Sequence, residues 1–104
     1  MATHNPEPGV VPMILEVEFL GLARDLSRTS RAQVQLDDHA TWRDLIRYLG
    51  IHYPSLIGQV ITPVVCDLTS SYMLNLGGRR VVRNLDVPAQ AGARVLLMFA
   101  EAGG

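Results

Sequence analysis

The chain has 104 residues, which suits one domain with a single modest core, so a roomy catalytic cleft between domains is not expected. Hydrophobic residues make up 48% of the sequence, yet no apolar run approaches the ~20 residues that a membrane-spanning helix needs. The formal net charge is -1 and no basic block interleaves with aromatic residues, which argues against nucleic-acid binding.

The composition also bears on the cellular compartment and on the available chemistry. Residues 1–12 are rich in proline and glycine and lack a basic start followed by an apolar core, so we expect a disordered N-terminal arm and no secretory signal. Cys66 is the only cysteine, which rules out an intramolecular disulfide and favours a cytoplasmic protein. The basic residues are all arginine, so the sequence offers no lysine amine as an acylation target.

The first elements expected along the chain are two strands. In residues 15–19, apolar side chains alternate with Glu16 and Glu18, which is typical of a strand with one buried face. The polar residues 24–31 predict a long, arginine-bearing loop. Alternation resumes over residues 32–36, so we expect a second strand that pairs with the first as a hairpin.

A helix should follow the second strand. Thr41, with Asp44 three residues on, resembles a capping box at the helix start, and Gly50 should end the helix. Residues 53–59 suggest a turn and a further short helix, with Ile57 and Val60 pointing inward. The apolar stripe of the main helix follows helical spacing and comprises Trp42, Leu45, Ile46 and Leu49.

The second half of the chain predicts a hairpin and a buried strand. Residues 62–71 receive no assignment, because Pro63 forbids an ordinary central strand. Residues 72–76 and 79–82 flank Gly77-Gly78, a pair suited to the positive φ of a tight turn. A turn at 88–92 precedes the apolar run 95–99, which suits a central strand buried on both faces.

This order of elements predicts an α+β fold of the β-grasp type. We expect a mixed sheet of four to five strands over residues 13–99, with one main helix packed across one face and the last strand parallel to the first. Residues 100–104 should form a flexible tail, because nothing large or apolar fastens them. Extended, they would reach roughly 15–18 Å, and glycine can thread a narrow channel.

The pattern as a whole resembles the sulfur-carrier branch of the ubiquitin-like proteins, which includes the small subunit of molybdopterin synthase and the thiamine-pathway carrier. The resemblance covers nearly all of the chain from Met13 onward. The residues that carry it are those at 19–24, 41–49, 53–56, 74–75, Leu85, 92–95 and the final Gly103-Gly104.

The resemblance implies a carrier that is not catalytic alone and binds no cofactor or metal. A ubiquitin-activating-type enzyme would use ATP to adenylate the Gly104 carboxylate, and a sulfur donor would convert the acyl-adenylate to a thiocarboxylate. The sulfur would then pass to an acceptor such as the molybdopterin synthase large subunit. The remaining candidate site residues are Gly103, Ala102 and Glu101 for recognition of the tail, and Phe99 and Arg24 for contact with the partner.

Two other functions fit the same residues. In a ubiquitin-like protein modifier, Gly104 would form an isopeptide bond with target lysines; in a β-grasp interaction module, the terminal glycines would be incidental. Phe99 could also be a core residue. We expect ordinary structural roles for the other reactive side chains: Cys66 as a small buried hydrophobe, and Asp37-Asp38 at the positive end of the helix dipole. The histidines lack the spacing of a metal site and are expected to be solvated or next to a helix; they are His4, His39 and His52.

Overall fold

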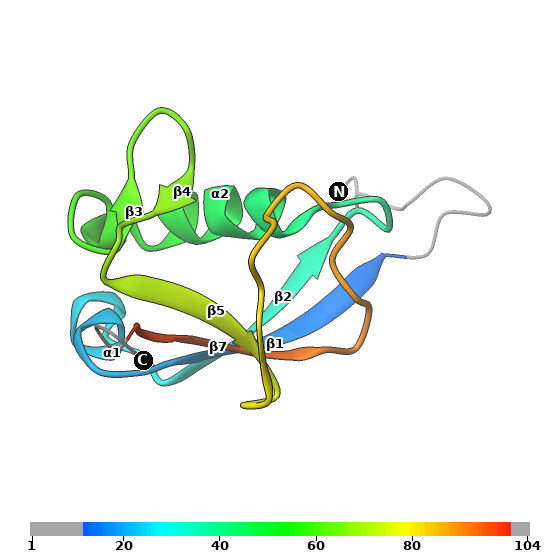
Figure 1. Cartoon of the computed structure of the whole chain (residues 1–104), viewed down its shortest axis with the longest axis horizontal. Helices are drawn as coiled ribbons and strands as arrows, with labels where there is room; N and C mark the ends of the chain where they lie inside the picture. The colour runs from blue at the N-terminus through cyan, green and yellow to red at the C-terminus, as the bar shows by residue number, and fades with distance from the viewer. Residues whose placement is uncertain (1–11, 101–104) are drawn as a thin grey trace, which may run out of the picture.

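The computed structural model describes residues 12–100 and shows a five-stranded sheet with one long helix across one face (Figure 1). The strand order is β2-β1-β7-β5-β6, and a separate two-stranded ladder pairs β3 with β4. The central strand β7 runs parallel to β1 and antiparallel to β5. The elements are β1 (Met13–Phe19), α1 (Leu22–Ser27), β2 (Arg31–Leu36), α2 (Trp42–His52), the 3-10 turn η1 (Pro54–Leu56), β3 (Ile61–Thr62), β4 (Asp67–Leu68), β5 (Tyr72–Leu76), β6 (Arg80–Val81) and β7 (Arg94–Phe99).

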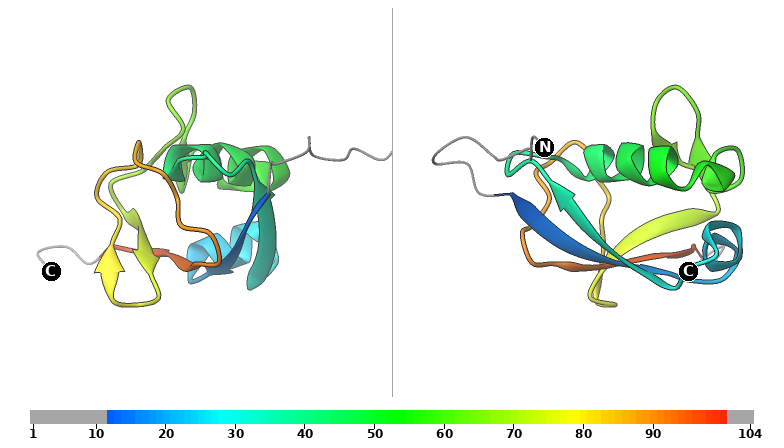
Figure 2. Two further views of the ribbon diagram at one scale, coloured as in Figure 1. Left: turned by 90° about the vertical axis from the view of Figure 1, so that its right-hand side faces the viewer. Right: turned by 180° about the vertical axis from the view of Figure 1, so that it is seen from behind.

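This arrangement confirms the β-grasp prediction, including the parallel pairing of the first and last strands. Figure 2 shows the two layers, with α2 above the sheet and the opposite sheet face uncovered by any described helix. None of the helices within residues 12–100 is long and apolar enough to span a bilayer.

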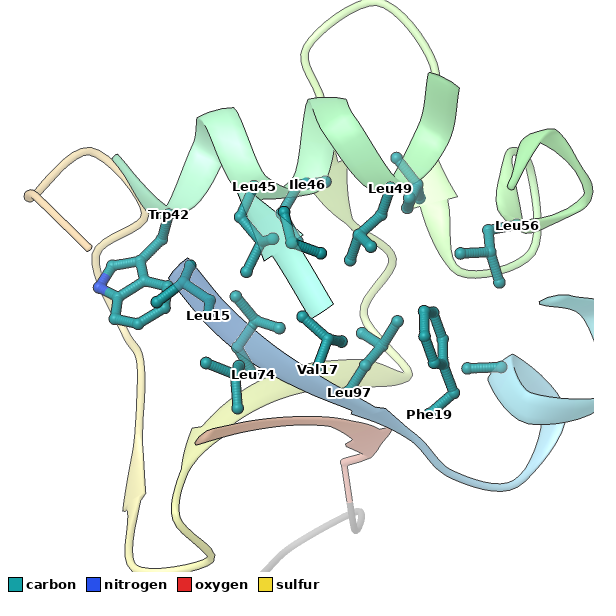
Figure 3. Packing of buried hydrophobic residues seen from close by; sticks show 14 of the residues in the cluster. Leu15, Val17, Phe19, Trp42, Leu45, Ile46, Leu49, Leu56, Leu74 and Leu97 are labelled. Carbon is teal, nitrogen blue, oxygen red and sulfur yellow. The ribbon is translucent and has the colours of Figure 1, made fainter. Parts of the chain in front are cut away.

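The core lies between α2 and the inner face of the sheet. The expected alternation places Leu15, Val17 and Phe19 of β1 fully inside, and the predicted stripe of α2 faces them (Figure 3). Each fully buried large apolar side chain contributes about 1.5–3 kcal/mol, so this contact is the main anchor of the helix.

The predicted capping box starts α2. The Thr41 hydroxyl accepts a hydrogen bond from the Asp44 backbone N–H at 3.2 Å, and the Asp44 carboxylate accepts one from the Thr41 backbone N–H at 2.9 Å. That backbone hydrogen bond lowers the pKa of Asp44 below its ordinary value, with Arg47 helping. The first turn of the helix is thereby fixed against the sheet.

Two predictions about helices were wrong. Residues 22–27 form α1 instead of a loop, with Ala23 buried, and Arg28 ends the helix in the left-handed region at φ 62°. Gly50 does not stop α2, which continues to His52. A Cβ on Gly50 would lie 3.6 Å from Ile57, so this glycine serves close packing, and the helix ends before Pro54, whose ring disfavours helical backbone at the preceding residue.

Most of the β3–β4 ladder lies in residues 62–71, for which the sequence predicted no element. In this ladder Ile61 is opposite Leu68 and Thr62 is opposite Asp67. Pro63 lies in the connecting turn, outside the ladder, as its missing N–H requires. Val60 is fully buried as expected. Ile57 is exposed to 43%, so the prediction that it points inward was wrong, because η1 ends at Leu56, which takes the buried position instead.

The hairpin of β5 and β6 and the last strand β7 lie close to the residue ranges predicted from the sequence. Gly77 and Gly78 have φ values of 60° and 81°, the left-handed region that the turn between β5 and β6 requires. β7 is central, and Val95 and Leu97 are fully buried beneath α2. Phe99 departs from the expected two-sided burial, since it is 58% exposed.

Candidate functional site

The candidate site is the point where the chain leaves the end of β7. The Ala100 backbone N–H donates a hydrogen bond of 2.7 Å to the Ser71 carbonyl oxygen, just before β5. This bond ties the last described residue to the domain body. The predicted site residues Glu101, Ala102, Gly103 and Gly104 lie outside the described residues.

Phe99 stands beside this anchor. Its ring packs edge-on against Tyr72, with centroids 5.7 Å apart and planes at 87°, while 58% of the residue remains exposed. Tyr72 itself is buried, and its hydroxyl oxygen has no hydrogen-bond partner among residues 12–100. The buried Tyr72 ring thus packs against one side of the Phe99 ring, and the rest of Phe99 is open to solvent. Contact between Phe99 and a partner stays a prediction.

Arg24 lies on α1, which contacts the end of β7. Its side chain is exposed and makes no ion pair with the described part of the chain. Leu22, on the same helix, is 42% exposed and was missed as a candidate contact. The available signal was an apolar residue directly after Gly21, in a segment that the sequence pattern predicted to be a loop.

The sheet face opposite α2 adds a mixed surface next to the anchor. Met73 and Met98 are register partners on β5 and β7, and alternation places both on this outer face. Further along, the Glu18 carboxylate accepts two hydrogen bonds from Arg94, at 3.0 and 3.2 Å, and lies 3.6 Å from Arg31. A half-buried apolar pair thus borders an ion cluster.

The other reactive side chains are not brought together. Cys66 is half-buried in the turn between β3 and β4, His39 lies 3.5 Å from Asp38, and the His52 ring stacks on Tyr48 at 4.0 Å. His4 lies outside the described residues. Within residues 12–100, no group of three or more histidine, cysteine, aspartate or glutamate side chains could hold a metal ion.

These features define a small domain with the β-grasp, ubiquitin-like fold, in which a central last strand ends at a fixed exit point. The sequence matches no protein-family model, and no curated protein matches it. Comparison with solved structures does find clear neighbours.

Small archaeal modifier protein 1 of Haloferax volcanii aligns with a TM-score of 0.73 at 20% identity, over 88% of this chain and 99% of that one. The HVO 2177 protein of the same organism gives 0.73 at 25% identity, over 98% and 94%. A Pyrococcus furiosus protein assigned as molybdopterin converting factor, subunit 1, gives 0.67 at 20% identity, over 82% and 94%. The structural neighbours are therefore ubiquitin-like small proteins, and the likeness establishes the fold.

Proposed function

We propose that this protein is a sulfur carrier whose Gly104 carboxylate is adenylated and then converted to a thiocarboxylate. The observation that carries the proposal is the anchor at Ala100, which holds the start of the C-terminal residues at one point on the end of the central strand. Four residues beyond Ala100 can reach about 13–14 Å when extended, far enough to enter the active site of a partner enzyme.

The chemistry needs a partner because a C-terminal carboxyl with a pKa of ~3.3–3.7 is an anion at neutral pH and a poor electrophile. A carboxylate oxygen of Gly104 attacks the α-phosphorus of ATP in the adenylating enzyme, and pyrophosphate leaves. A sulfur donor at the level of sulfide then attacks the acyl carbon and AMP leaves, so that a thiocarboxylate remains. The chain contributes the acyl group and the docking surface.

The acceptor in this proposal is the large subunit of a molybdopterin synthase. The Pyrococcus furiosus neighbour assigned as molybdopterin converting factor, subunit 1, supports this choice of pathway. The tail cannot supply the affinity, because ordering it costs about 1–2 kcal/mol per residue. In our proposal the partners therefore dock on the folded body around Phe99, with Arg24 and Glu101 as secondary contacts.

A protein modifier is the second candidate. The similarity to small archaeal modifier proteins from two organisms supports it. Since this sequence has no lysine, conjugates could not be extended through its own side chains, which fits a single-copy tag.

Pyrophosphate exchange tests the shared first step. The full chain, incubated with ATP, labelled pyrophosphate and the adenylating enzyme of its host, should support exchange, and a variant lacking Gly104 should not. The circular dichroism spectrum of the variant should match that of the parent. Exchange by the deletion variant would sink the proposal. A ladder of covalent conjugates on denaturing gels of cell extract would favour the modifier over the carrier.

A further inference from the structure

A cleft of about 190 Å³ lies away from the anchor, between β6 and the loop that leads into β7. Its lining includes Arg80 and Arg83, and also Val87, Pro88 and Gln90 from the loop that leads into β7. Trp42, the first residue of α2, also lines it. The site proposed above uses none of these residues.

The ionised side chains that line the cleft are all cations. Arg80 and Arg83 are exposed and form no ion pair within residues 12–100. The sequence has no aspartate or glutamate from position 68 to position 85. The next acid, Asp86, is held by Arg43 through two hydrogen bonds of 2.7 and 3.2 Å, which keep its pKa below the ordinary value. Neither guanidinium group of the cleft therefore has an ion-pair partner within residues 12–100.

A nearly buried hydrogen-bond donor, the Trp42 indole, lines the same cleft. Trp42 is only 2% exposed, and Figure 3 shows its indole nitrogen pointing away from the other labelled core side chains, towards the segment that follows β6. The indole nitrogen forms no hydrogen bond within the described residues. The fully buried polar side-chain atoms without a hydrogen-bond partner among residues 12–100 are those of Tyr72 and Asn75. Trp42 therefore brings to the cleft lining an indole N–H that pairs with no atom of residues 12–100.

Two amide side chains complete the lining. The Asn84 carbonyl oxygen accepts a hydrogen bond of 2.9 Å from the Asp86 backbone N–H, which fixes the amide and leaves its NH₂ group without a partner in the described chain. Gln90 also lines the cleft. The cleft thus gathers two planar cations, an indole N–H and amide donors, with no ionised acceptor.

We propose that this cleft binds the phosphate group of a small ligand. A dianion matches the two uncompensated charges, and guanidinium forks pair with phosphate through paired hydrogen bonds. A volume of about 190 Å³ slightly exceeds the ~150 Å³ cavity that holds benzene and falls short of the ~300 Å³ typical of drug-sized sites. The site therefore takes the phosphate itself, from inorganic phosphate or from a phosphate monoester whose remainder stays in solvent.

The single tryptophan supplies a specific probe. The full chain, labelled with ¹⁵N, is titrated with sodium phosphate at constant ionic strength, and the indole N–H signal of Trp42 is followed by NMR. We expect a saturable shift. Arg80→Gln combined with Arg83→Gln should weaken binding about tenfold or more, whereas Arg79→Gln, which removes the same charge from outside the cleft lining, should leave it nearly unchanged.

Parallel titrations with AMP and acetate define the ligand. Equal or tighter binding of AMP supports the proposal and identifies a phosphate monoester as the source, while weaker AMP binding points to free phosphate. Acetate binding as tight as that of phosphate would overturn the assignment of a phosphate site. So would a shift that sodium chloride reproduces, or unchanged affinity in a double variant whose NMR spectrum remains that of a folded domain. Because the readout does not involve Gly104, its outcome is independent of the carrier proposal.

Discussion

Phe99 and Leu97 lie two residues apart on β7 and allow stability to be separated from docking. Leu97 is fully buried, so Leu97→Ala should lower the free energy of unfolding by about 2–5 kcal/mol. Phe99 is 58% exposed, so its burial supplies less than half of the ~1.5–3 kcal/mol of a fully buried side chain. Its edge contact with Tyr72 adds about 0.5–1.5 kcal/mol, so Phe99→Ala should cost about 1–3 kcal/mol.

Urea unfolding, monitored by circular dichroism, measures both costs. Partner docking is measured separately, as the kcat/KM of the adenylating enzyme with each variant as substrate. The assay is run without urea and at a temperature at which each variant is folded. We expect Phe99→Ala to lower kcat/KM through a raised KM, while folded Leu97→Ala keeps it near the parent value. A stability loss for Phe99→Ala as large as that for Leu97→Ala would refute the reasoning from exposure. An unchanged kcat/KM for Phe99→Ala would remove Phe99 from the docking surface.

Other predictions concern elements that hold the fold. Gly77→Ala should destabilise the protein by about 1–2 kcal/mol in thermal melts, because its φ of 60° strains an L-residue although space is free; no loss would contradict the turn geometry. Thr41→Ala should cost about 0.5–2 kcal/mol through the lost cap, and Ser55→Ala, outside the cap, should cost less. Asp44 has a folded pKa below its unfolded value, so its stabilisation is present above about pH 4 and lost as the pH falls through the folded value. The stability difference between the parent and Asp44→Asn, measured by urea unfolding, should therefore shrink in acid, and a constant difference from pH 3 to 7 would contradict this sign.

Local sequence signals predicted much of the fold because they have direct physical causes. The alternation of residues 15–19 follows from one buried face, the Thr41 and Asp44 pair from the unsatisfied N–H groups of a helix start, and Gly77-Gly78 from the positive φ of the turn. The apolar run at 95–99 indicated a central strand, and β7 does lie between β1 and β5. Burial on both faces, the basis of that prediction, holds for Val95, Leu96 and Leu97 but not for Met98 and Phe99.

The failures arose where tertiary contacts override local preference. Helix α1 has only six residues and buries only Ala23, so its sequence shows no apolar stripe with helical spacing. Gly50 suggested a helix end, but its missing Cβ instead allows Ile57 to approach. Phe99 belongs to the apolar run that predicted a buried strand. It is the last residue of β7 and lies beyond the residues of that strand that the core covers, so Phe99 is exposed. The cleft around Trp42 was not predicted, because it joins residues from three separate segments.

Intact mass spectrometry of the protein after incubation with ATP, sulfide and the adenylating enzyme of its host tests the proposed function most directly. We expect the mass gain of one oxygen replaced by sulfur, located at Gly104 by fragmentation and absent without ATP. A mass that stays unchanged, with an enzyme that is active on its own carrier, would contradict the assignment of this protein as a sulfur carrier.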